Sequence, residues 1–480
     1  MNKRIILLTI FSMLLLYNCT STRELYIDYD NNILTRKIND ALKYSDLTTN
    51  MGIKVVSLRS GKILYSLNSN HLFTPASNNK LYTASAALHY LSPQFKFKTS
   101  VWIDSSYIDS NHVPRLVLVG GGDPDLFLSE LEVIAKEISE NIESIDTLII
   151  NNTLFDDVYF GPGWMWDEGS DWYFAHVNAM TFNDNCVDIT ITPGAIGEKP
   201  IVSLNPGTKF VDIINEAVTV EDTIDSKELE IERRWEENNN VIDISGEVMK
   251  DANEEIHYIN IENPALFTGT VLFDLLNQLS TEVKIGIFEG QKSSTMIPFY
   301  TYYSEPITNS LANFLETSDN LSGELYVKMI GHVISGQQGN WDNGMLAIKT
   351  FLNDKVKIDT TKMRMEDGSG LSRYNLTSPD QLTKLLKYMY SDFIYTSEFI
   401  AVLPSIGQEG TLKDRMQLIE NKYSIRAKTG TLSGVSCLSG YAFIKSGEPL
   451  AFSIMMNGYV DESKPYQDLQ DRICEILVGY

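Results

Sequence analysis

The chain has 480 residues, of which 43% are hydrophobic and 21% are charged, and this balance indicates a globular protein of two or three domains. Acidic residues outnumber basic ones by 63 to 39, which gives a formal net charge of -24. Because phosphate groups are bound by basic surfaces, this charge argues against nucleic acid or anionic lipid as a partner.

The N-terminus has the pattern of a secretory signal peptide. Lys3 and Arg4 precede an apolar run over residues 5–16, which is too short to span a bilayer comfortably. Cys19 comes directly after this region, as in the lipobox of bacterial lipoproteins. We therefore expect a signal peptide over residues 1–19 and a periplasmic protein whose only membrane attachment is lipid on Cys19. Cleavage without lipidation, which would give a soluble periplasmic protein, is the alternative.

The hydrophobic pattern predicts the elements in order along the chain. A short helical segment within residues 20–50 is followed by a hairpin with strands at 53–58 and 62–67, and then by a helix that begins near Ser77. A helix is predicted at 128–142, among strands at 101–103, 116–119 and 147–150. Short strands and acidic turns occupy residues 181–261, and a helical pattern resumes near residue 299.

Ser77 and Lys80 form a Ser-x-x-Lys motif at the start of a predicted helix. Residues three apart lie on the same face of a helix, so the hydroxyl of Ser77 and the amine of Lys80 can touch. A serine beside a lysine that can lose its proton is a nucleophile with its base supplied. Alone, this motif is more often a solvated helix start, so its meaning depends on the motifs that follow.

A second motif, Ser318-Asp319-Asn320, is predicted in a loop between helices. Ser318 can relay a proton there, and the amide of Asn320 can bind a substrate amide. The alternative is a simple helix cap, because Ser, Asp and Asn are the residues that helix N-termini prefer.

A third motif, Lys428-Thr429-Gly430, is predicted on a strand. Lys428 can hold positive charge over a site, Thr429 can bind a carboxylate, and Gly430 lets the backbone approach closely. An edge strand in this position could bind an extended peptide through main-chain hydrogen bonds. The alternative is a hairpin strand with an ordinary surface lysine.

Together, and in this order, the three motifs are those of penicillin-binding proteins and class A β-lactamases. Longer stretches are more specific, namely LVGGGDPDL at 118–126, GPGWMWD at 161–167, DGSGLSR at 367–373, LPSIGQEGTL at 403–412 and KTGTLSG at 428–434. With these stretches the chain resembles, over roughly residues 30–475, the D-alanyl-D-alanine carboxypeptidase/endopeptidase family of class C low-molecular-mass penicillin-binding proteins (peptidase family S13). That family also has a long insertion between its first two motifs.

The resemblance implies an α/β (α+β) fold of the β-lactamase/transpeptidase type, with a five-stranded antiparallel sheet flanked by helices. We expect the catalytic domain in two parts, at residues 20–97 and 297–480, and a long, mostly β inserted region at residues 98–296. No cofactor and no metal is expected.

The resemblance also implies a serine-type D-Ala-D-Ala carboxypeptidase, with D,D-endopeptidase activity, that acts on peptidoglycan stem peptides and binds β-lactam antibiotics. Ser77 would form the acyl-enzyme, and Lys80, neutral in the free enzyme, would take its proton. Ser318 would pass a proton to the leaving amine, and Lys428 would supply a fixed positive charge.

The substrate-binding roles come from the same resemblance. Asn320 would hold the substrate amide, and Thr429, next to Gly430, would bind the terminal carboxylate. The backbone N–H groups of Ser77 and Thr431 would form the oxyanion hole.

The inserted region is expected to contribute an acidic residue that meets the free amine of diaminopimelate, and Asp167 and Glu168 are the two candidates. Nearby tryptophans could form a carbohydrate platform, but packing against the host domain is the expected role of Trp164, Trp166 and Trp172. Two functional alternatives stay open. One is strict D,D-endopeptidase action on cross-links, and the other is a non-catalytic cell-wall-binding lipoprotein of the same fold.

Overall fold

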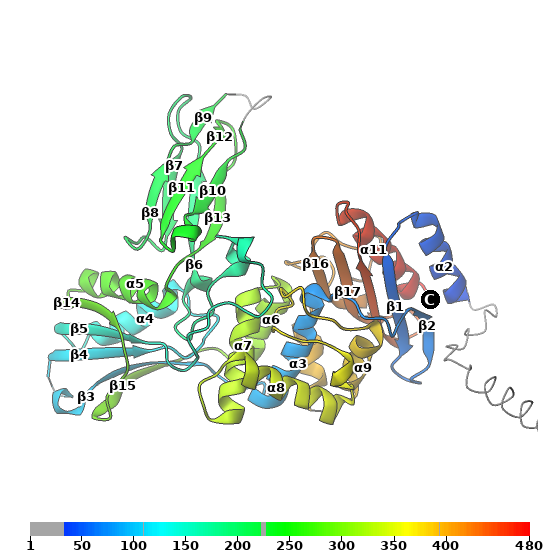
Figure 1. Cartoon of the computed structure of the whole chain (residues 1–480), viewed down its shortest axis with the longest axis horizontal. Helices are drawn as coiled ribbons and strands as arrows, with labels where there is room; N and C mark the ends of the chain where they lie inside the picture. Colours follow the sequence, from blue (N-terminus) through cyan, green and yellow to red (C-terminus); the bar gives the residue numbers. More distant parts are fainter. Residues whose placement is uncertain (1–32, 109, 222–226, 393) are drawn as a thin grey trace, which may run out of the picture.

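The computed structural model describes residues 33–480 except 109, 222–226 and 393. The expected signal peptide and Cys19 therefore lie outside the described residues. Within the described part of the chain, no helix is both long and apolar enough to cross a membrane. Figure 1 shows a body of helices and a sheet that contains both ends of the described chain, a second sheet with two helices beside it, and a β-rich part that projects from the second body.

The first body is built on a five-stranded antiparallel sheet in the order β16-β17-β18-β1-β2. The predicted hairpin forms β1 (Asn50–Ser57) and β2 (Ile63–Leu67). The C-terminal part of the chain supplies β16 (Ile425–Leu432), β17 (Val435–Phe443) and β18 (Pro449–Asn457). The central strands are buried along most of their length because helices cover both faces. The predicted catalytic-domain sheet is thus confirmed, with β16 at its edge.

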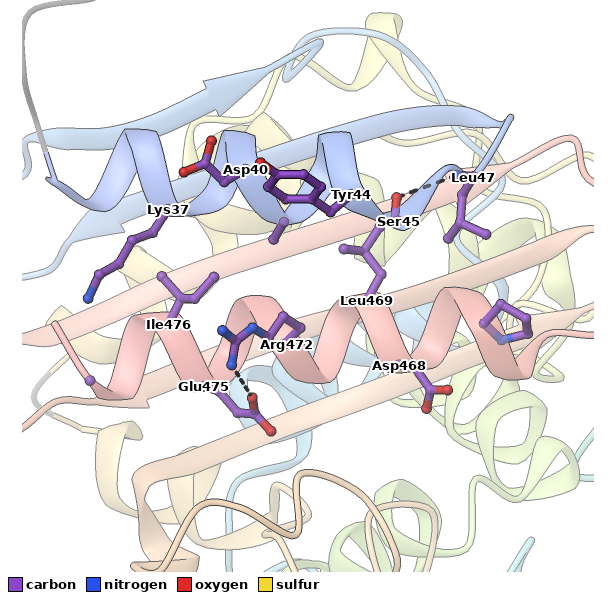
Figure 2. Close-up of a pocket in the computed structure, with 13 residues that line it drawn as sticks. Lys37, Asp40, Tyr44, Ser45, Leu47, Asp468, Leu469, Arg472, Glu475 and Ile476 are labelled. Carbon is purple, nitrogen blue, oxygen red and sulfur yellow. Dashed lines mark hydrogen bonds and ion pairs between the residues drawn. The ribbon is translucent and has the colours of Figure 1, made fainter.

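One face of this sheet is covered by the first and last helices of the described chain, α2 (Ile33–Ser45) and α11 (Lys464–Val478). Figure 2 shows the two helices side by side, with charged side chains of both along the groove between them. This groove has a volume of about 810 Å³.

The opposite face is covered by a cluster of helices with a shared core. Its members are α3 (Lys80–Leu91), α6 (Ile307–Glu316), α7 (Asn320–Ser335), α8 (Trp341–Phe351), α9 (Pro379–Ser391) and α10 (Thr396–Val402). Residues 80–88 of α3 are all buried, and a helix that is buried all round lies in the centre of a body. This central position explains why Lys80, at the start of α3, is withdrawn from water.

The inserted region begins with a mixed five-stranded sheet in the order β14-β5-β4-β3-β15. Two helices, α4 (Leu128–Ser139) and α5 (Pro264–Gln278), accompany it. Its strands are β3 (Lys98–Asp104), β4 (His112–Val119), β5 (Ser144–Asn151), β14 (Glu282–Glu289) and β15 (Met296–Tyr303). Because β15 pairs with β3, the inserted sheet continues to Tyr303, and the expected boundary at residue 297 falls inside β15. The insertion as a whole has thirteen strands, β3 to β15, and two α-helices, α4 and α5, within the described residues.

The rest of the insertion consists of short strands, as predicted for residues 181–261. They form the sheets β13-β6-β7, β10-β11-β8 and β12-β9. Their bounds are β6 (Cys186–Thr192), β7 (Ile201–Asn205), β8 (Asp212–Asn215), β9 (Val218–Val220), β10 (Glu230–Arg233), β11 (Val241–Ser245), β12 (Glu247–Met249) and β13 (Glu255–Asn260). One hydrophobic core joins these strands to the larger inserted sheet, so the insertion packs as a unit.

Candidate active site

Ser77 lies in a short 3-10 turn, Ala76–Asn79, that leads directly into α3. The neighbours of Ser77 fix this turn to two other parts of the catalytic body. The side chain of Asn78 donates a hydrogen bond to the carbonyl of Lys428 (3.1 Å), and that of Asn79 donates to the carbonyl of Asp367 (2.8 Å). The first and third sequence motifs are therefore adjacent, as predicted.

Lys80 joins the first and second motifs. Its Nζ lies 2.9 Å from Oγ of Ser77 and donates to Oδ1 of Asn320 (2.6 Å) and to the carbonyl of Ser369 (2.9 Å). The residue is completely buried. Burial lowers the pKa of Lys80 to about 8, although nearby carboxylates, Asp319 first among them, act to raise it. A usable fraction of neutral amine is therefore present near pH 7, within reach of the Ser77 proton.

The second motif is both a helix cap and a part of the site. Asp319 caps α7, since its carboxylate accepts from the N–H groups of Leu321 (3.1 Å) and Ser322 (2.6 Å). This cap makes Asn320 the first residue of α7, and the Asn320 amide donates to the carbonyl of Tyr173 (3.0 Å) in the inserted region. Ser318, just before the cap, has a left-handed φ of 67°. It lines a cleft that residues of the first and third motifs also line.

Lys428 lies on β16 and is also completely buried. Within the described residues, its Nζ has no hydrogen-bond partner. Burial, together with the nearby charge of Lys80, lowers the pKa of Lys428 well below its usual value. The expected fixed positive charge on Lys428 stays a prediction, and among the described residues no hydrogen-bond partner is present to stabilise it.

The outer edge of β16 lines a cleft through Thr429, Gly430 and Thr431. Ala427 donates its N–H outward to the carbonyl of Pro404 (3.0 Å). Because backbone N–H groups alternate in direction along a strand, those of Thr429 and Thr431 also point away from β17. At Gly430 a Cβ atom would lie 2.7 Å from the carbonyl oxygen of Pro75, so only glycine fits against the Ser77 turn.

These groups converge on a cleft of about 390 Å³ between the catalytic body and the inserted region. The three motifs contribute Ser77, Ser318, Asn320, Thr429, Gly430 and Thr431 to its lining. The inserted region contributes Glu168, Trp172 and Tyr173.

The structure separates the two acidic candidates of the inserted region. Glu168 lines the cleft, and its carboxylate accepts a hydrogen bond from the hydroxyl of Tyr173 (2.7 Å). Asp167 is exposed and is not among the residues that line the cleft. The three tryptophans lie in two places: Trp172 lines the cleft, whereas Trp164 and Trp166 line a different cavity.

Glu324 is a buried acid of the site that the sequence did not reveal. Its carboxylate accepts from the N–H groups of Gly368 and Ser369 (2.8 Å each) and from the indole of Trp341 (2.8 Å). Burial raises the pKa of Glu324 to about 7. Because the carbonyl of Ser369 accepts from Lys80, Glu324 positions a residue that holds Lys80. The only sequence signal was its position one helical turn after Asn320.

The DGSGLSR stretch forms a turn next to the site. Asp367 holds it together by accepting from the N–H groups of Gly370 (2.9 Å) and Ser372 (2.6 Å). At its end, Arg373 reaches the cleft and donates to the carbonyl of Ser433 (2.8 Å). Arg373 thus brings a positive charge to the cleft, a role that the sequence reading did not assign to it.

A serine beside a desolvated lysine, with an edge strand alongside, defines a serine acyl-transfer enzyme of the β-lactamase/transpeptidase fold. Within the described residues, no cluster of His, Cys, Asp and Glu could hold a metal ion. The sequence profile of the D-Ala-D-Ala carboxypeptidase 3 (S13) family matches residues 34–477. The chain belongs to this family, and it is a D-alanyl-D-alanine carboxypeptidase.

Individual relatives agree with this assignment. A D-alanyl-D-alanine carboxypeptidase from an Actinomadura species is 32% identical over 427 residues, which cover 85% of this chain and 78% of the relative. The D-alanyl-D-alanine carboxypeptidase DacB of Haemophilus influenzae is 25% identical over 87% of this chain and 88% of the relative. The crystal structure of penicillin binding protein 4 (dacB) from Haemophilus influenzae has the same fold, with a TM-score of 0.80 at 21% identity over 92% of this chain and 99% of that chain.

Proposed function

We propose that the chain removes the terminal D-Ala of peptidoglycan stem peptides through an acyl-enzyme on Ser77. The observation that carries this proposal is the 2.9 Å separation of Ser77 Oγ and the desolvated Nζ of Lys80. Neutral Lys80 takes the hydroxyl proton as Oγ bonds to the carbonyl carbon of the penultimate D-Ala. The C–N bond then breaks, and the leaving amine receives a proton by way of Ser318. Water hydrolyses the resulting ester and restores Ser77.

The backbone N–H groups of Ser77 and Thr431 would stabilise the oxyanion. Ser77 and Thr431 both line the cleft, and the N–H of Thr431 points out from the edge of β16. Such donors act strongly because they are already oriented where charge develops. The terminal carboxylate of the substrate would bind at Thr429, near Lys428. That carboxylate would supply the counter-charge that Lys428 lacks and would raise its pKa, so Lys428 becomes charged as substrate binds.

The third residue of the stem peptide would be recognised by Glu168. A diaminopimelate side chain ends in an amine and a carboxylate, and the cleft offers Glu168 and Arg373 as opposite charges. We assign the amine to Glu168 rather than to Asp167, because only Glu168 lines the cleft. A charge-assisted hydrogen bond of this kind contributes about 1.5–3 kcal/mol when it is shielded from water.

The same chemistry would cleave D,D cross-links, because only the leaving amine changes. Digestion of purified muropeptides, with the products identified by mass spectrometry, distinguishes carboxypeptidase action, endopeptidase action and the absence of catalysis. Pentapeptides shortened to tetrapeptides demonstrate carboxypeptidase action, and dimers converted to monomers demonstrate endopeptidase action. Products from dimers alone would indicate a strict endopeptidase, and no products at all would indicate the non-catalytic lipoprotein.

β-Lactams should acylate Ser77, since they present a strained amide to the same nucleophile. The penicillin binding protein 4 (dacB) of Haemophilus influenzae has been crystallised in complex with a β-lactam, and its structure matches this chain with a TM-score of 0.75. Labelling with fluorescent penicillin tests this part of the proposal without any natural substrate.

We place the enzyme in the periplasm, anchored by lipid on Cys19. The support is the charged start, the apolar run at residues 5–16 and the cysteine that follows. A single acyl chain binds membranes only marginally, so stable anchoring requires more than one chain. Unchanged membrane fractionation and N-terminal mass in Cys19→Ala would contradict lipidation.

A further inference from the structure

A second cavity, of about 600 Å³, shares a segment of chain with the catalytic cleft. Within residues 161–174, Trp164, Trp166 and Phe174 line this cavity, whereas Glu168 and Tyr173 line the cleft. The segment ends in the 3-10 turn η4 (Trp172–Phe174), which packs against both α7 and β13. The cavity is therefore lined by the inserted region and lies beside the segment that also lines the cleft.

The walls of the cavity are aromatic. The rings of Trp166 and Trp235 lie 5.5 Å apart at a tilt of 55°, and those of Trp164 and Phe174 lie 5.4 Å apart. Trp166 is 73% exposed, so its indole is not buried by packing against the rest of the protein. The expectation that these tryptophans pack against the host domain holds in part for Trp164, whose indole N–H donates to Asp367 (3.0 Å). It is wrong for Trp166.

The floor of the cavity is polar. His176 is 4% exposed, and its Nδ1 has no hydrogen-bond partner in the described part of the chain. Burial lowers the pKa of His176 to about 4, so the ring is neutral near pH 7 and adds no positive charge to the cavity. The carboxylate of Glu262 lies 3.7 Å from Nε2 of His176 and 3.6 Å from the guanidinium of Arg233.

The charges of the lining argue against an anionic ligand. Arg233 is the single cation among the lining residues other than the neutral His176, and Glu236 and Glu262 outnumber it. The guanidinium is already engaged, since Nε donates to the carbonyl of Asn260 (2.9 Å) and Nη1 to that of Asn239 (3.0 Å). The cavity thus combines large apolar faces with a few polar groups and without free positive charge, which suits a neutral, polyhydroxylated ligand.

We propose that this cavity binds an N-acetylhexosamine unit of the glycan strand that carries the stem peptide. A pyranose ring presents apolar C–H faces that suit the indoles of Trp166 and Trp235. Its hydroxyl and acetamido groups can reach the part-exposed carboxylate of Glu262. The choice of a peptidoglycan sugar rests on the proposed function, whereas the sugar-binding chemistry rests on the cavity itself.

The spacing of the two sites fits one muropeptide. Trp166 and Glu168 are two residues apart, so their Cα atoms lie within about 7 Å of each other. A stem peptide reaches from the sugar to its third residue over a few residues of about 3.3–3.6 Å each. A sugar at Trp166 and a third-residue amine at Glu168 can therefore belong to the same molecule.

Titration calorimetry, used to measure the binding of tetra-N-acetylchitotetraose to the full chain, tests the sugar site without catalysis. We expect saturable binding by the wild type and roughly tenfold weaker binding by Trp166→Ala. Because Trp166 is mostly exposed, this variant should fold. Trp102→Ala is the matched control, since Trp102 lies in β3 beneath Lys292 and does not line the cavity. No binding by the wild type, or equal weakening in both variants, would overturn the proposal.

A kinetic comparison tests the link to the substrate. The wild type should have a KM roughly tenfold lower for disaccharide-pentapeptide than for free pentapeptide, with similar kcat, because the sugar adds uniform binding. Trp166→Ala should abolish this difference and retain normal acylation by penicillin. An equal preference in wild type and variant would refute the sugar site. A wild type that penicillin does not acylate would instead refute the proposed function, so the two failures are distinguishable.

Discussion

Lys80 and Lys428 show how burial acts on single residues of the site. Both side chains are completely buried, but Lys80 has three hydrogen-bond partners and Lys428 has none among the described residues. The sequence places a lysine in each motif, yet it does not reveal that neither lysine is solvated. The pKa of each is therefore lowered by desolvation, and the charge state of each depends on what binds nearby.

Arginine substitutions separate the roles of the two lysines. Lys80→Arg should abolish acylation by penicillin, because arginine keeps the charge but cannot act as a base at neutral pH. Lys428→Arg should retain a measurable part of the acylation rate, because a cation is what a bound carboxylate requires. The rates can be measured with fluorescent penicillin, and circular dichroism confirms folding. Equal losses of the acylation rate in two folded variants would show that the lysines do not differ as base and cation.

Glu168 is the residue of the inserted region that should recognise the amine of the third stem-peptide residue. The ratio of kcat/KM for free-amine and N-acetylated stem peptides should be about 10 to 100 in the wild type, which corresponds to about 1.5–3 kcal/mol. Glu168→Gln should bring this ratio close to one. Asp167→Asn is the matched control and should leave it unchanged, since Asp167 does not line the cleft. A wild type that treats both peptides alike would exclude recognition of the amine.

At the scale of elements, the N-terminus of α7 organises the site. Its first turns supply the cap Asp319, the Lys80 partner Asn320 and the buried Glu324. The sequence offered a cap or a catalytic triplet as alternatives, and in the structure Asp319 caps α7 while Asn320 contacts Lys80. Helical periodicity could not show what Glu324 binds, because the backbone N–H groups that it accepts from lie in a turn more than forty residues away.

A pair of substitutions at Asp319 separates capping from electrostatics. Asp319→Ala should lower stability by about 1–2 kcal/mol, whereas Asp319→Asn should change it little, because asparagine also caps helices well. Both variants remove a carboxylate that raises the pKa of Lys80. The rise of kcat/KM with pH, which we expect near pH 8 in the wild type, should therefore move to lower pH in both. An unshifted profile in the folded asparagine variant would contradict this coupling.

At the scale of the whole molecule, sequence reasoning found the catalytic sheet and the place of the insertion but not the end of the insertion. From the sequence, the strand over residues 296–303 was expected at the start of the second catalytic part. Its hydrophobic pattern does not reveal which strand it pairs with. It pairs with β3, almost two hundred residues earlier in the chain, and such long-range pairing leaves no local signal. The sequence raised a carbohydrate platform only as the less favoured role of the tryptophans, since Trp166 meets Trp235 only through the fold of the insertion.

A buried acid in the LVGGGDPDL stretch of the inserted region should make global stability depend on pH. Asp123 is 2% exposed, and burial raises its pKa to about 7. The folded state then binds this proton more tightly than the unfolded state does, so the stabilisation is complete below about pH 4 and is lost as pH rises through about 7. Urea unfolding at pH 5 and pH 8 should show a loss on the order of 2 kcal/mol. Asp123→Asn should reduce this loss, and an unchanged pH dependence would contradict the assignment.

The most direct test of Ser77 as the nucleophile is the position of the penicillin adduct. After incubation of the purified chain with penicillin, peptide mass mapping should place one acyl group on Ser77, which lies 2.9 Å from the amine of Lys80. Lys80→Arg should show no adduct under the same conditions. An adduct on any other serine, or none on the folded wild type, would contradict the claim that Ser77 is the nucleophile.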